Sequence, residues 1–331
     1  EGLLRERLQL FLDGGRVEEY RLLLAFASSL LRGLPAGRSH AMPKPMLVGG
    51  QSHVDGFLRF KRFRGPGKRE DGTPPLLLAA SAGDVQTLEG LLLARADVNS
   101  VEPRNHRPYC VRAGDRAMDN AAVHGHAAVV SALLRFRAHV DSRDCIGATP
   151  LHNAGVGGSK SVLELLLARR ADIDAASSLK TTALIMAVSF GREDCVRCLL
   201  AARASTCPDP DAGSLLHVAS LMESGPSVVR MLLAARCSME VRFQPRAGSI
   251  HWVLNTSWSM SYRAGRRSFW NAFGYHSWGS TPLMYAAMCS NTIEARVLLD
   301  SGADPWAKNS RGASAMEIPA VFGGGSILAM Q

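Results

Sequence analysis

The chain has 331 residues, of which 47% are hydrophobic and 20% charged, and its formal net charge at pH 7 is +9. This content is sufficient for a continuous core, and no run of about 18 apolar residues predicts a membrane span. The positive charge favours an acidic partner without indicating a fold. The seven cysteines are odd in number and scattered, which predicts free thiols and an intracellular compartment, cytoplasmic or nuclear.

Residues 1–70 come first and are the least regular part of the chain. Leu8 to Leu24 reads as two short helices around a Gly-Gly break, which suggests a degenerate capping unit, and a basic linker follows. In this linker, Phe57 to Arg69 interleaves six Lys or Arg with three Phe. The stretch indicates either a patch for an anionic surface or nuclear import, or a solvated basic loop packed on the next unit.

Residues 71–240 are built from a repeated unit of two short helices, best defined between Gly147 and Asp174. Thr149 can cap the first helix, and Pro150 occupies the position where a missing N–H costs nothing. A Gly-Gly pair ends that helix, and the apolar stripe from Val162 to Leu167 predicts the second. Neither helix can bury its apolar face alone, so the unit predicts stacking.

The unit recurs with a period close to 33 residues. The same position of the unit is alanine in four successive repeats and marks the register. These alanines, Ala121, Ala154, Ala187 and Ala219, are spaced by 33, 33 and 32 residues. The sequence segments around the last three of these alanines are TPLHNAG, TALIMAV and SLLHVAS, and a similar segment, TPLMYAA, occurs later in the chain. This period and the T-P-L-H-x-A pattern resemble the ankyrin repeat. The resemblance implies an all-α ankyrin-repeat solenoid, with stacked helix-turn-helix repeats and short hairpin-like finger loops.

Two segments interrupt this register. An enlarged loop is expected at residues 100–115, between the first and second of five repeats. Residues 241–279 contain four Trp and five Arg but no Asp or Glu, and they form either an inserted loop or a decayed repeat. Residues 280–331 contain a last full repeat and a partial capping repeat.

Residue types associated with catalysis and metal binding have structural explanations here. The resemblance implies that His152 and His217 tie neighbouring repeats together. Cys195 and Cys198 form a CxxC, which invites a redox or zinc hypothesis, but both occupy apolar positions of a second helix. No nucleotide-binding, hydrolase, metalloprotease or kinase signature is found. The sequence therefore predicts no catalytic residue, no metal and no cofactor.

Five repeats in succession carry an arginine where ankyrin repeats usually have glycine after the second helix. A side chain at such a positive-φ position costs on the order of 1 kcal/mol relative to glycine, partly offset by a cation beside a helix C-terminus. Stacking predicts a basic strip along one edge, with tolerated drift as the alternative. The strip comprises Arg95, Arg137, Arg170, Arg203 and Arg236.

The resemblance also implies where a partner binds, because ankyrin repeats use their finger tips and the exposed ends of their first helices. At the finger tips the candidates are Arg112, Ile146, Leu179, Trp278 and Arg311. At the helix ends they are His124, Val156, Phe190, Met222 and Met288. Among these, Phe190 and Trp278 are the leading anchors.

These observations predict a non-catalytic, monomeric module or scaffold that binds an unidentified protein, acidic in character, through its concave groove. Two alternatives stay open. One is nucleic-acid or anionic-membrane binding through the basic and aromatic segments. The other is a regulatory ankyrin region within a larger enzyme.

Overall fold

The computed structural model describes residues 75–101, 115–144, 146–178, 180–207, 213–245, 255–257, 259–260, 263 and 269–318. The expectations for residues 1–70 and for the interior of the enlarged loop lie outside these ranges. At the base of that loop, Val101 and Arg116 form an isolated antiparallel bridge.

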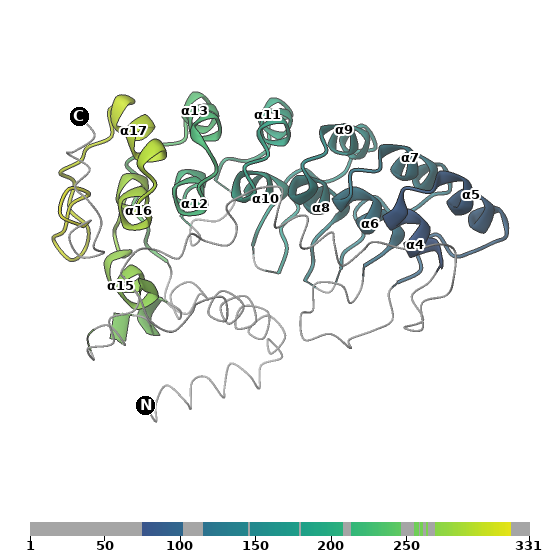
Figure 1. Ribbon diagram of the computed structural model, residues 1–331, viewed down its shortest axis with the longest axis horizontal. Coiled ribbons are helices and arrows are strands. Elements are labelled where there is room, and N and C mark those ends of the chain that lie inside the picture. The colour runs from purple at the N-terminus through teal and green to yellow at the C-terminus, as the bar shows by residue number, and fades with distance from the viewer. Residues whose placement is uncertain are drawn as a thin grey trace.

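Within these described ranges, six helix pairs form a stack in two rows (Figure 1). The first helices, which make up one row, are α4 (Pro75–Ala82), α6 (Ala117–Val123), α8 (Pro150–Gly157), α10 (Ala183–Ser189), α12 (Leu215–Met222) and α16 (Pro282–Cys289). The second helices, which make up the other row, are α5 (Val85–Leu93), α7 (Ala127–Arg135), α9 (Lys160–Ala168), α11 (Glu193–Ala201), α13 (Pro226–Ala234) and α17 (Thr292–Asp300). The described part of the chain contains no named strand, and this confirms the all-α ankyrin solenoid.

Each helix begins where its capping residues place it. Thr149 has an extended backbone before α8, and its side chain and that of His152 form a reciprocal capping box. Pro150 follows at the first helical position. In α9, the side chain of Ser159 accepts a hydrogen bond from the backbone N–H of Val162.

The core is continuous along the stack and follows the repeat register. Gly155 permits one close contact, because a Cβ there would lie 2.8 Å from the carbonyl oxygen of Ala183. The fully buried alanines at the register position are Ala121, Ala154, Ala187, Ala219 and Ala286. Leucines at one register position of the second helices are buried to the same degree, namely Leu133, Leu166, Leu199, Leu232 and Leu298.

The fifth helix pair packs directly on the last pair. Helix α12 contacts α16 and α13 contacts α17, as neighbouring pairs do elsewhere in the stack. His217 Nε2 lies 3.0 Å from the carbonyl oxygen of Ser280, 63 residues later, whereas the equivalent His152 contacts Thr181 only 29 residues later. We therefore interpret residues 241–279 as an insertion between two adjacent repeats.

Part of this insertion covers the last pair. Helix α15 (Phe269–His276) lies beside α16, outside the two rows (Figure 1). The Phe273 ring packs edge-on against Tyr285 with centroids 5.0 Å apart, and Phe243 packs against the same tyrosine at 5.8 Å. All eight residues of α16 are buried.

Candidate protein-binding surface

The two register histidines act as ties between repeats. His152 Nδ1 accepts from the backbone N–H of Thr149 at 3.1 Å, so its Nε2 carries the proton that is donated to Thr181 at 2.8 Å. His217 makes the same pair of contacts, with Ser214 and Ser280. Burial lowers the pKa of His152 and lowers that of His217 to about 4. Both imidazoles are therefore neutral structural groups.

A second set of ties links the loops that follow the second helices. In four repeats a side chain accepts a hydrogen bond from a backbone N–H of the next repeat, at 2.7 to 3.2 Å. The four acceptors are Asn99, Asp141, Asp174 and Glu240. These loops are therefore held in fixed register along one edge of the stack.

The CxxC pair belongs to α11 and its packing. Cys195 is fully buried in the core, and burial raises the pKa of its thiol to about 12, while the pKa of Cys198 is also raised. A protonated thiol is a poor nucleophile and a poor metal ligand. No cluster of three or more potential metal ligands exists within the described ranges. The surroundings of Cys195 and Cys198 therefore support a role in helix packing rather than in redox chemistry or zinc binding.

The predicted finger-tip residues occupy different environments. Arg112 and Leu179 lie outside the described residues. Ile146 and Trp278 are half-buried, and the carbonyl oxygen of each accepts a backbone hydrogen bond at 2.9 Å from the next finger. Arg311 is exposed, but its guanidinium lies 4.6 Å from the centre of a tyrosine ring in α15. This tip is thus joined to the insertion.

The predicted helix ends form a more uniform group. His124, Val156, Phe190 and Met222 are all half-buried. Met288 does not belong with them, because it is only 1% exposed and forms part of the core. The expectation that Met288 is accessible was therefore wrong. The reason is that α12, α17 and the insertion pack around α16, whereas α8, α10 and α12 each keep some residues that are only half-buried.

The five arginines after the second helices do adopt the left-handed conformation. Their φ values lie between 61° and 64°, and all five are exposed. Each backbone N–H donates to a carbonyl oxygen in the last turn of its helix, at 2.9 to 3.2 Å. The last repeat has Gly302 at this position, with φ of 94°.

Asp119 is a notable residue that the sequence analysis did not single out. It occupies the histidine position of the second repeat and is 2% exposed. Its carboxyl accepts from the backbone N–H of Arg116 at 3.0 Å and from the Asn153 amide at 3.2 Å. Burial raises its pKa to about 8, with nearby Asp115 adding to the effect. Alignment of RAMDNA with TPLHNA is the signal that identifies this substitution.

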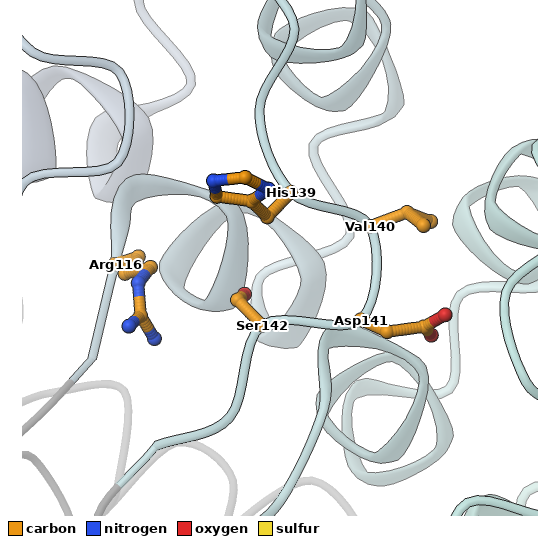
Figure 2. Close-up of a pocket in the computed structure, with 5 residues that line it drawn as sticks. All are labelled: Arg116, His139, Val140, Asp141 and Ser142. Atoms are coloured by element: carbon orange, nitrogen blue, oxygen red, sulfur yellow. The ribbon is translucent and has the colours of Figure 1, made fainter.

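A small recess lies beside the second finger (Figure 2). Its volume is about 360 Å³, and its lining residues are Arg116, His139, Val140, Asp141 and Ser142. The Ser142 hydroxyl is buried and has no hydrogen-bond partner among the described residues. The side chains of Arg116 and Asp141 point away from each other in Figure 2, so they do not converge on one ligand.

Comparison with known proteins defines the family. A model of three consecutive ankyrin repeats matches residues 76–177 and 158–242, and a single ankyrin-repeat model matches residues 278–310. These matches cover more than half of the chain, so it belongs to the ankyrin-repeat family. The segment between them corresponds to the insertion.

One solved structure shows the same architecture. The crystal structure of the human ASB11 ankyrin repeat domain is similar over 75% of this chain and 96% of that chain, with a TM-score of 0.55 and 25% sequence identity. No curated protein matches the sequence.

Among the described helices, none is both long and apolar enough to cross a bilayer. Ankyrin repeats generally serve as protein-interaction modules.

Proposed function

We propose that this chain is a non-catalytic scaffold that binds a protein partner through the face presented by the ends of its first helices and its finger tips. The observation that supports this most directly is a run of half-buried apolar side chains at the ends of three successive first helices, Val156 on α8, Phe190 after α10 and Met222 on α12. These helices pack against one another, so the three side chains lie on neighbouring elements. Accessible apolar and aromatic side chains that adjoin one another are typical anchors of protein interfaces.

The test compares affinity capture by the intact array with capture by the Phe190→Ala, Trp278→Ala double variant. Interface anchors commonly contribute about 2 kcal/mol or more, so partners of this face should be lost from the variant. The matched control is Leu93→Ala, Trp306→Ala, which removes two side chains that are 74% and 59% exposed but lie outside the predicted set.

Both variants must keep the wild-type urea midpoint for the comparison to be valid. Loss of the same partners from both variants would indicate nonspecific apolar adhesion. A partner list that is unchanged in the first variant would contradict the proposed binding face.

A further inference from the structure

The arginine row defined by Arg95, Arg137, Arg170, Arg203 and Arg236 has a geometry that singles out one kind of ligand. The row follows α5, α7, α9, α11 and α13, each of which packs on the next. Each arginine is the second residue after its helix, and the backbone hydrogen bond to the last turn fixes its position. The inter-repeat ties from Asn99, Asp141 and Asp174 hold the adjoining loops in register. The row is therefore a periodic array of cations, and these ties hold it in register from Arg95 to Arg203.

The side chains of the row are available for binding. Within the described ranges, none of the five guanidinium groups forms an ion pair or a side-chain hydrogen bond. By contrast, Arg135 next to the row pairs with Glu89, and Arg143 donates to backbone carbonyl oxygens. The row thus retains its full capacity for forked hydrogen bonds to carboxylates.

The acids near the row already have partners. Asp97 and Asp172 each lie two residues after an arginine and accept from a backbone N–H at 2.9 and 3.2 Å. Asp141, Asp174 and Glu240 accept from the next repeat. These carboxylates reduce repulsion among the arginines, but backbone amides, rather than guanidinium groups, satisfy them.

The backbone conformation carries a cost that glycine would avoid. A non-glycine residue in the left-handed region is less stable than glycine by on the order of 1 kcal/mol, and five sites carry this cost in succession. The attraction of a cation to a helix C-terminus recovers about 0.3–1 kcal/mol at each site. Stability alone therefore does not favour arginine over glycine here.

We propose that the arginine row binds an extended acidic segment of a partner polypeptide with a carboxylate at about every third residue. Packed helices lie about 8–10 Å apart, and a chain in the extended polyproline II conformation advances about 3.1 Å per residue with three residues per turn, so every third side chain lies on one side and three residues match one repeat. Five arginines then span about 13 residues of ligand. Nucleic acid fits less well, because base stacking needs interleaved aromatic side chains and only Phe136 directly adjoins an arginine of the row.

This surface adds to the proposed function and does not depend on the groove residues. The probe is a labelled peptide of about 15 residues with Glu at every third position among Ser and Gly. Its isomer has the same composition with the Glu residues contiguous. Fluorescence anisotropy at about 150 mM salt, where exposed charges are screened beyond about 8 Å, should show at least fivefold tighter binding of the spaced peptide.

Three protein variants separate the row from general charge and from the groove. Arg137→Gly, Arg170→Gly, Arg203→Gly should weaken binding of the spaced peptide at least about tenfold and also raise the urea midpoint, because glycine suits the left-handed region. The matched control, Arg197→Gln, Arg230→Gln, Arg296→Gln, removes the same charge from exposed faces of α11, α13 and α17 and should change binding less than about twofold. The Phe190→Ala, Trp278→Ala variant should bind the peptide normally, so that failure of either proposal is recognised separately.

Several results would overturn the inference. Equal affinity for the two peptides, or an equal loss in the glutamine variant, would show nonspecific charge attraction. Binding of oligothymidylate or of phosphatidylserine vesicles, without binding of either peptide, would assign the row to a different polyanion. A glycine variant that binds the spaced peptide as tightly as the wild type would show that these arginines do not contact it.

Discussion

At the residue scale, Asp119 departs furthest from the chemistry of its counterparts. Where the third and fifth repeats use a neutral histidine to donate to the next repeat, this position has a carboxyl that accepts from Asn153 and Arg116. Burial raises its pKa from 3.8 to about 8. The folded protein therefore binds a proton there that the unfolded chain releases at neutral pH.

This difference predicts a pH effect on stability. The contribution of Asp119 to the free energy of unfolding is fully present below about pH 4 and is lost as the pH rises through about 8. Over this range the free energy of unfolding changes by at most about 1.4 kcal/mol per pH unit. The free energy of unfolding should fall between about pH 6.5 and 8, an interval in which folded His217, with its pKa near 4, stays neutral. Asp119→Asn keeps the shape and should flatten this dependence and raise stability at about pH 7.5, as measured by urea unfolding.

The control for this prediction is Asp300→Asn, which changes an exposed carboxyl at the end of α17. A residual slope is expected in the Asp119 variant, because burial also raises the pKa of Asp144. Identical pH profiles for wild type and Asp119→Asn would contradict the argument.

At the element scale, two glycines within helices have opposite roles. Gly90 lies in α5, where an added Cβ would meet no neighbouring atom within 4 Å, so this glycine only weakens the helix. Gly157 ends α8 against the previous repeat, where an added Cβ would overlap the carbonyl oxygen of Val123. The effect of a substitution at Gly90 therefore depends on helix propensity, whereas its effect at Gly157 depends on the close approach of the backbone of Val123.

The same substitution should consequently have opposite signs at these two sites. Gly90→Ala should raise the free energy of unfolding by about 0.5–1 kcal/mol through helix propensity. Gly157→Ala should lower it by about 1–3 kcal/mol, because the backbone of Val123 must move. Urea unfolding of both variants, which differ from the wild type by the same methyl group, provides the measurement. Stabilisation by both would show that α6 and α8 are packed less closely than the structure indicates.

At the scale of the whole molecule, each helix pair contacts its neighbours, so stability is a sum of local terms. Phe243 is a key residue at the junction of the fifth and last pairs. It is 4% exposed, packs on His217 and Tyr285, and exchanges two backbone hydrogen bonds with Gly279 and Ser280. The last pair therefore depends on a residue at the very start of the insertion.

We expect Phe243→Ala to make the last helix pair, α16 and α17, unfold more readily than the other helix pairs. Removal of a buried phenylalanine side chain costs about 3–5 kcal/mol, and here that loss falls on one junction. Hydrogen exchange should accelerate in α16 and α17 while α6 to α11 stay protected, and Phe243→Leu should show a much smaller effect. Uniform acceleration along the whole array would contradict a junction-specific role.

Much of this architecture was predictable from local chemistry. The cap at Thr149, the buried alanine register and the left-handed arginines follow from rules that act within a few residues, and the structure has all three. The insertion was not decidable in this way, because its length is close to one period. Ala219 and Ala286 therefore stand two periods apart whether or not a repeat lies between them.

The candidate binding surface was less predictable than the fold. His124, Val156, Phe190 and Met222, expected at the exposed ends of the first helices, lie at those helix ends but are half-buried. The register failed for Met288, because accessibility there depends on packing by a segment that has no repeat pattern. Partner contacts at the other positions stay a prediction.

The ties between loops also determine how the array responds to bending. At the junction of the fourth and fifth pairs, Cys207 stands where the other repeats have Asn, Asp or Glu, and Ile185 stands at the histidine position. Neither side chain can supply the hydrogen bond that its counterparts make. Among the described residues, this junction lacks both kinds of side-chain tie, so we expect the stack, considered as an elastic rod, to bend readily there, between Phe190 and Met222. The curvature of the proposed binding face would then adjust at this joint, while the segments on either side stay stiff.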